Sequence, residues 1–182
     1  FTPNQFRVIS LPDGDKSGVK AICQLKNGDV LVGARSKNVY LLDMKGRVKQ
    51  VFDYAHHQIG SIYHAMYDDR QNLWLSTKGD GLVKLTPDAS RPIGYRIDHY
   101  RHDARDPYSI SGNNVYMTYQ DSRHRIWVAT LDGGLNLLEE QGGKVRFYNK
   151  YHGMKNYPGY GLYMDARNLV EDSHQRMWVG TM

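Results

Sequence analysis

The chain has 182 residues, 40% of them apolar, which is enough for one domain with a real hydrophobic core. The net charge is +5, but the Lys and Arg residues are scattered along the chain, which argues against a nucleic-acid-binding face. A single cysteine, Cys23, excludes an internal disulfide framework, and no apolar run reaches the roughly eighteen residues of a membrane span. No signal peptide precedes Phe1, so we expect a chain that is soluble or cut from an anchored protein.

One ten-residue sequence motif occurs four times along the chain, and its copies are only partly identical. The copies read LKNGDVLVGA from Leu25, DDRQNLWLST from Asp68, DSRHRIWVAT from Asp121 and DSHQRMWVGT from Asp172. The Trp of the last three copies aligns with Leu31 in the first, at spacings of 43, 53 and 51 residues. Such spacings are typical of a propeller blade and are too long for a leucine-rich or ankyrin unit.

Each repeat reads as a series of strands. A first strand, such as VKAICQL or VYMTYQD, leads into a tight polar turn, and Asn27-Gly28 predicts a two-residue hairpin there. The second strand, such as LWLS or IWVA, is apolar at nearly every position, as expected where both faces of a sheet are covered. A turn with Gly leads to a third strand, and a polar fourth strand such as YRIDHY indicates an exposed outer edge.

We therefore predict an all-β fold, a β-propeller fragment of about three and a half four-stranded antiparallel blades with almost no helix. In chain order we expect an outer strand of a preceding blade at 1–10, blades at 18–53, 62–101 and 115–151, and the start of another blade at 166–182. An open arc leaves its terminal faces uncovered, so the chain alone is expected to associate or aggregate.

The repeated residues have a structural explanation. We expect Trp74, Trp127 and Trp178 to fill the space between adjacent blades, each burying about 200 Å². The Asp that opens the last three copies is expected to accept hydrogen bonds from backbone N–H groups of the turn. None of these residues is a predicted ligand residue.

The run DPYSISGNNVYMTYQDSRHRIWVATLDGGL, from Asp106 to Leu135, resembles the two-component regulator propeller repeat, with Gln120 and Ala129 in place of the customary Glu and Gly. The resemblance implies the periplasmic sensor region of a hybrid histidine kinase and response regulator of Bacteroides-like bacteria. Such a region detects oligosaccharides and controls polysaccharide-utilisation genes. The resemblance also implies further blades of the same chain, a homodimer in the full sensor, and a membrane anchor only outside this chain.

A ligand site is predicted at one end of the blades. The loop leading into each first strand and the loop between second and third strands emerge at that same end. Aromatic faces, hydrogen-bonding groups and cations gathered there suit an oligosaccharide, and the cations favour an acidic one. The residues that open the first strands are expected to ring the mouth of a central channel. The predicted ligand-binding residues are Lys20, Arg35, Tyr63, Lys78, Tyr116, Asp132 and Arg167.

No catalytic, metal-binding or cofactor-binding residue is predicted. The neighbours His56 and His57 point apart and lack a third ligand, and Asp80 and Asp132 are ordinary residues of Gly-rich turns. Cys23 is expected to be a small core residue. Two other function classes stay open: a propeller enzyme of lyase or hydrolase type, which needs a convergent His/Glu or His/Lys group, and a protein-interaction scaffold, which needs an exposed apolar patch on one propeller face.

Overall fold

The computed structural model describes Phe6 and residues 8–12, 17–131, 133–155, 157 and 165–181. These residues form fourteen strands and one short helix, α1 (Tyr54–His57). The strands make three four-stranded sheets and one two-stranded sheet, and all their pairs are antiparallel. The predicted fold class, a fragment of about three and a half blades, is confirmed.

Each sheet is built from consecutive strands in chain order. Blade 1 holds β1 (Val19–Gln24), β2 (Val30–Ala34), β3 (Val39–Leu42) and β4 (Val48–Phe52). Blade 2 holds β5 (Ile62–Tyr67), β6 (Leu73–Thr77), β7 (Leu82–Pro87) and β8 (Tyr95–Tyr100). Blade 3 holds β9 (Val115–Gln120), β10 (Ile126–Thr130), β11 (Gly134–Gln141) and β12 (Lys144–Tyr148). Half-blade 4 holds β13 (Ala166–Glu171) and β14 (Met177–Thr181).

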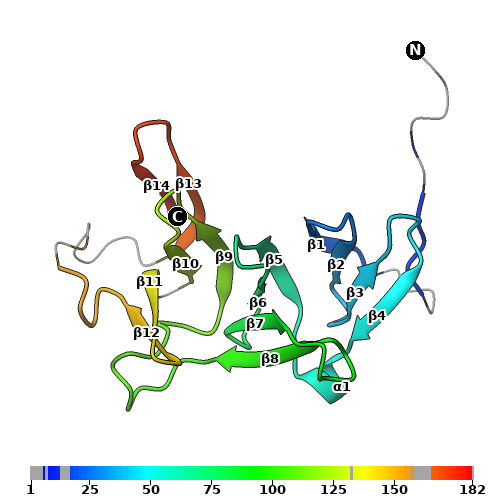
Figure 1. Ribbon diagram of the computed structural model, residues 1–182. Coiled ribbons are helices and arrows are strands. Elements are labelled where there is room, and N and C mark those ends of the chain that lie inside the picture. The colour runs from blue at the N-terminus through cyan, green and yellow to red at the C-terminus, as the bar shows by residue number, and fades with distance from the viewer. Residues whose placement is uncertain are drawn as a thin grey trace.

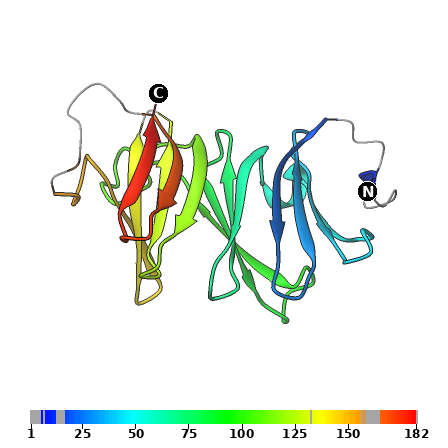
Figure 2. The same ribbon diagram turned by 90° about the horizontal axis from the view of Figure 1, so that it is seen from above.

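The sheets stand side by side in an arc, with blade 1 and half-blade 4 at its two ends (Figures 1 and 2). The first strands β1, β5, β9 and β13 are neighbours along one edge of the arc. The outer strands β4, β8 and β12 lie along the opposite edge (Figure 1). This arrangement is the radial packing of a β-propeller, in which first strands line the central channel.

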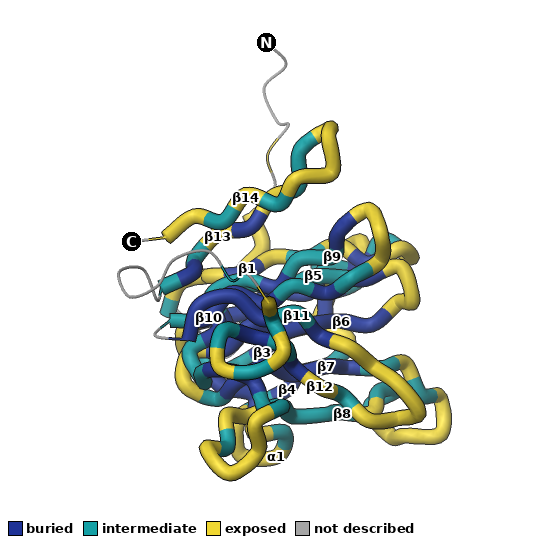
Figure 3. The backbone as a smooth tube through the Cα atoms, turned by 90° about the vertical axis from the view of Figure 1, so that its left-hand side faces the viewer, coloured by how far each residue is buried: buried dark blue, intermediate teal, exposed yellow. Residues whose placement is uncertain are grey.

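The hydrophobic core consists of layers between neighbouring blades. One buried cluster joins blades 1 and 2 through residues such as Leu31, Leu75 and Val83. A second joins Trp74 of blade 2 to blade 3, and a third joins blade 3 to Ala166 and Leu169 of half-blade 4. Burial is concentrated in the middle strands, whereas β14 is mostly exposed (Figure 3). Each blade therefore depends on its neighbours to cover its apolar faces.

The turn between first and second strands is one residue longer than Asn27-Gly28 predicts. Leu25 and Asp29 close a three-residue loop, with Gly28 at φ 85°. The later copies hold Gln71, His124 and Gln175 at this left-handed position, with φ between 58° and 66°. A non-glycine residue is strained there, so other contacts must stabilise the turn.

The described part of the predicted first strand pairs with no other strand. Phe6 and Val8 are 93% and 91% exposed, and residues 8–12 carry no strand. A strand needs an edge to bond with, and the blade predicted to supply that edge is not among the described residues. Within the described part of the chain, no helix has the length and apolar character to cross a bilayer.

Candidate functional site

Three equivalent hydrogen bonds show that the two sets of predicted loops share one end of the arc. The backbone N–H groups of Arg35, Lys78 and Leu131 begin the loops after the second strands. They donate to the carbonyl oxygens of Gly18, Ser61 and Asn114, which precede the first strands, at 3.0, 2.8 and 2.9 Å. This common face is called the channel end below.

A β-bulge interrupts the first strand of every blade at the same place. Between the first and third residues of β1, β5, β9 and β13, the pairing with the second strand skips one residue. A bulged residue is left out of the ladder, and the local bend changes the direction of its side chain. The four skipped residues are Lys20, Tyr63, Tyr116 and Arg167. These four are called the ring residues.

Three of the ring residues form a continuous row across blades 2, 3 and 4. The rings of Tyr63 and Tyr116 stack with centroids 4.8 Å apart and an interplanar angle of 19°. The guanidinium carbon of Arg167 lies 4.9 Å from the centroid of Tyr116. Cation–π attraction and stacking therefore hold the row in one geometry. Because the ring of Tyr116 already contacts both Tyr63 and Arg167, a ligand reaches this row through its hydroxyls, its guanidinium group and the remaining face of Tyr63.

The row contains a hydrogen-bond donor that no described residue satisfies. The Nε atom of Arg167 is buried and has no hydrogen-bond partner among the described residues. A buried guanidinium N–H without a partner is costly, and an acceptor supplied by a ligand would satisfy it. Burial, together with the neighbouring Tyr116 hydroxyl, raises the pKa of Tyr63, although Arg167 opposes the shift. The Tyr63 hydroxyl therefore keeps its proton at neutral pH and can donate as well as accept.

The remaining predicted site residues surround this row less closely. Lys20 is the ring residue of blade 1, and its side chain is exposed. Arg35 and Lys78 are exposed at the channel end. Asp132 lies outside the described residues. The structure thus brings Tyr63, Tyr116 and Arg167 together and leaves the predicted lysines and Arg35 at the rim.

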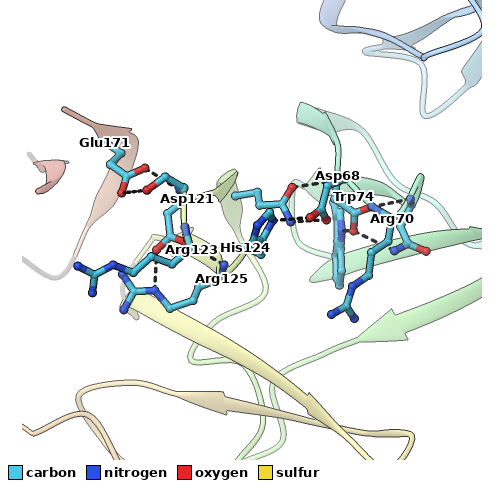
Figure 4. Close-up of polar contacts among 12 residues, drawn as sticks. Asp68, Arg70, Trp74, Asp121, Arg123, His124, Arg125 and Glu171 are labelled. Atoms are coloured by element: carbon cyan, nitrogen blue, oxygen red, sulfur yellow. Dashed lines mark hydrogen bonds and ion pairs between the residues drawn. The ribbon is translucent and has the colours of Figure 1, made fainter. Parts of the chain in front are cut away.

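The repeated Asp does more than the predicted turn capping. Asp68 Oδ1 accepts hydrogen bonds from the backbone N–H groups of Arg70 and Asn72, and its Oδ2 accepts the indole N–H of Trp74 at 2.7 Å. Asp121 and Asp172 bond Trp127 and Trp178 in the same way, at 2.7 and 2.9 Å. Figure 4 shows this Asp–Trp pair in blade 2. The constant spacing of six residues was the sequence signal for it.

No metal site and no reactive thiol emerge among the residues that the structure describes. No three His, Cys, Asp or Glu side chains in this part of the chain gather as metal ligands. The Nδ1 atom of His56 lies 2.9 Å from Asp53, which caps helix α1. Burial raises the pKa of the Cys23 thiol, which disfavours the reactive thiolate.

Residues 109–132 match the model of the family described as "Two component regulator propeller". The resemblance carried by the sequence run from Asp106 to Leu135 is thereby confirmed for this repeat. Among curated proteins, none matches the chain in sequence.

Several solved structures resemble the chain in fold. A virginiamycin B lyase from Staphylococcus aureus has a TM-score of 0.65 at 14% identity, with 94% of this chain and 51% of the lyase chain covered. The extracellular domain of a hybrid two-component system from B. thetaiotaomicron has a TM-score of 0.55 at 17% identity, with coverages of 95% and 27%. The Swd1 β-propeller domain of Myceliophteria thermophila scores 0.57 at 15% identity, with coverages of 79% and 48%. The chain spans about half of these structures or less, and the likeness establishes the propeller fold.

Proposed function

We propose that this chain is part of the ligand-sensing propeller of a hybrid two-component sensor, outside the cytoplasm and in the periplasm. Two findings support the proposal: the family match over residues 109–132 and the fold likeness to an extracellular sensor domain. In this proposal the propeller itself is not an enzyme. It binds an oligosaccharide and signals to a histidine kinase that controls polysaccharide-utilisation genes.

The observation that carries the binding role is the row of Tyr63, Tyr116 and Arg167. Bulges place these side chains on the channel edge of three successive blades, although the residues are 53 and 51 positions apart in the sequence. Proteins use β-bulges to re-aim side chains next to functional sites. Tyrosine hydroxyls and an open tyrosine face are groups that bind sugar hydroxyls and sugar rings.

The charge of the row favours an acidic sugar. The guanidinium group of Arg167 is a planar donor that pairs with a carboxylate or sulfate through two hydrogen bonds. Its buried Nε lacks an acceptor among the described residues, so an anionic substituent of the sugar would accept a hydrogen bond from it. Lys20, Arg35 and Lys78 add positive charge around the same end, which attracts an anion over longer distances.

Calorimetry on the sensor region that contains these blades tests this function. The probes are an oligogalacturonide and a neutral galacto-oligosaccharide of equal length. We expect the acidic probe to bind more tightly, and Arg167→Ala to weaken it by roughly ten- to a hundredfold. Tyr63→Ala is expected to weaken both probes.

A matched control separates the site from general charge. Arg91→Ala removes one positive charge from an exposed Arg that pairs with Asp88 away from the ring residues. It is expected to leave both affinities unchanged. Equal binding of the two probes would overturn the acidic preference, and unchanged affinities in both Arg167→Ala and Tyr63→Ala would place the ligand elsewhere.

A further inference from the structure

The loop that enters blade 3 borders a cavity at the channel end. This loop, residues 101–114, joins β8 to β9 and is longer than the loop 53–61 between blades 1 and 2. The cavity has a volume of about 370 Å³, which is within the usual range of small-molecule sites. Its lining comes from this loop and from Asn149 and Tyr151, which follow β12. None of the ring residues lines it, so it is separate from their row.

Two lining residues, Ser111 and Asn149, belong to a buried network of polar side chains. Its centre is Asn136 of β11, whose Oδ1 accepts the Ser111 backbone N–H at 2.9 Å and the Asn149 amide at 3.2 Å. The Asn136 Nδ2 donates to Ser111 Oγ at 2.8 Å and to the Val128 carbonyl oxygen at 3.3 Å. The corresponding residue of blade 2 is Val83, which packs among apolar side chains. A buried amide is costly unless it is bonded, so Asn136 serves to fix the loop.

The cavity belongs to the boundary between two complete blades. Leu138 lies two residues after Asn136, on the same face of β11, and packs with Trp74 of blade 2. Asn136 and the loop segment bonded to it are therefore on the side of blade 3 that faces blade 2. Blades 2 and 3 are both four-stranded, so the cavity is not part of an open end of the arc.

The outer side of the loop is attached to strand β12. The backbone N–H of Phe147 donates to the carbonyl oxygen of Tyr108 at 2.9 Å. The Tyr108 ring packs edge-on against His152, with centroids 4.3 Å apart, and the Arg146 guanidinium carbon lies 4.8 Å from the Tyr108 centroid. The loop is held on both sides of the cavity, so the cavity has a fixed shape. A preformed site loses less conformational entropy when a ligand binds.

The unpaired polar atoms of the lining include two acceptors. Asp106 Oδ1 accepts the Tyr108 backbone N–H at 2.9 Å, whereas its Oδ2 has no partner among the described residues. His102 Nδ1 lies 2.8 Å from the carbonyl oxygen of Ile110, so this nitrogen carries the proton. In the neutral ring, Nε2 is then an acceptor. A ligand of this cavity has to supply hydrogen-bond donors.

The charges around the cavity are balanced. Asp103 accepts two hydrogen bonds from the Arg105 guanidinium group, both at 3.1 Å. Lys150 Nζ lies 4.7 Å from the ring centroid of Tyr151 in the cavity wall. These two cations offset the carboxylates of Asp103 and Asp106. The cavity therefore favours a neutral ligand over an anion or a cation.

We propose that this cavity is a second carbohydrate subsite, which takes a neutral sugar unit. Sugar hydroxyls donate to Asp106 Oδ2 and His102 Nε2, and the Tyr151 ring, in a residue that is 63% exposed, packs against the apolar face of the sugar. The subsite goes beyond the proposed function, because its charge preference differs from that of the ring residues. It does not rest on them, and it is expected to bind sugar when their row is disabled.

Calorimetry with the row disabled tests the subsite. The protein is the sensor region that contains these blades, carrying Tyr63→Ala and Arg167→Ala together. The neutral probes are cellobiose, lactose, mannobiose and xylobiose, the acidic probe is digalacturonate, and the cationic probe is a disaccharide of glucosamine. At least one neutral probe is expected to bind, and to bind roughly tenfold more tightly than either charged probe.

Two further substitutions in this double variant locate the bound sugar. Asp106→Asn keeps an oxygen for the Tyr108 backbone N–H but replaces the free acceptor by a donor, and it is expected to weaken the neutral probe roughly tenfold or more. Tyr151→Ala removes the aromatic wall and is expected to have a similar effect. The matched controls are Asp88→Asn, at an Asp that caps a turn in the same way outside the cavity, and Tyr54→Ala, at another exposed Tyr. Both controls are expected to leave the affinity unchanged.

Thermal melting followed by circular dichroism verifies that every variant is folded. No binding of any neutral probe, tighter binding of a charged probe, or unchanged affinity in either Asp106→Asn or Tyr151→Ala would overturn the subsite. The ring residues are replaced in every protein of this comparison, so these outcomes do not bear on their role. A failure of the ring proposal is seen separately, as unchanged affinity for the acidic probe when only Arg167 or only Tyr63 is replaced.

Discussion

The repeated sequence motif places a Trp at the boundary between blades 2 and 3 and another on the open face of half-blade 4. The two Trp side chains differ in how far they are buried. Trp74 at the boundary is 1% exposed, whereas Trp178 on the open face is 57% exposed. Both indoles donate to the Asp six residues earlier, at 2.7 and 2.9 Å. The hydrogen bond is therefore a local property of the motif, but burial depends on the next blade.

Trp127, which faces the two strands of half-blade 4, is intermediate in burial and packs with Ala166 and Leu169. The expected burial of about 200 Å² per Trp is thus wrong for Trp178 in the single chain. A propeller blade has one fixed internal geometry, and the number of strands that face it decides how far its Trp leaves solvent.

The largest expected difference between the two regions is in core stability. Trp74→Ala removes a fully buried side chain and leaves a cavity, so the free energy of unfolding should fall by about 3–5 kcal/mol. Trp178→Ala should cost less than about 1 kcal/mol in dilute solution, where the ring is exposed. Urea titrations at several protein concentrations measure both effects. A loss of similar size for the two variants in dilute solution would break the comparison.

Two hydrogen bonds between Asp69 of blade 2 and Gln120 of blade 3, at 3.0 and 2.7 Å, offer a smaller test of the same boundary. Gln120→Glu places a second carboxylate against Asp69, whose Oδ1 accepts from the Gln120 amide at 2.7 Å. Like charges repel, so the melting temperature at neutral pH should fall by roughly 2 °C. Adding Asp69→Ser recreates the pair that Ser122 of blade 3 makes with Glu171 of half-blade 4, at 2.7 and 2.9 Å, and should restore the melting temperature. A double variant that melts no higher than Gln120→Glu would contradict a stabilising role for this contact between the blades.

The smallest expected effect is the acid response of the open face. The hydrogen bond from the Trp178 indole, aided by Arg176 and His174 N–H groups, lowers the pKa of Asp172 from 3.8 to about 2. Because the folded pKa is depressed, the stabilisation is complete above pH 3.8 and is lost as the pH falls through about 2. The indole N–H resonance of Trp178 should shift in that window. It should not titrate there in Asp172→Asn, and a shift at pH 4 or above in the parent chain would contradict the lowered pKa.

Much of this protein can be predicted from the sequence alone. The pattern of apolar residues is sufficient to predict the strands and their places in a blade, because buried second strands are apolar throughout and outer strands are polar. They also identify the turn-capping role of Asp68, Asp121 and Asp172, since an Asp side chain bonds N–H groups only a few residues away. The spacing of the repeats predicts the number and order of the blades. The residues that open each first strand are the predicted residues of the channel mouth.

Other features depend on contacts between residues that are far apart in sequence. The bulges direct Tyr63, Tyr116 and Arg167 to one row, and a bulge leaves no reliable mark in a single sequence. The stacking of the two tyrosines arises only when blades 2 and 3 are packed together, and so does the burial of Arg167 Nε, which has no hydrogen-bond partner among the described residues. The difference between Trp74 and Trp178 likewise has no local cause. Sequence determines what each blade is, and packing between blades determines which of its side chains are buried, paired or free to bind.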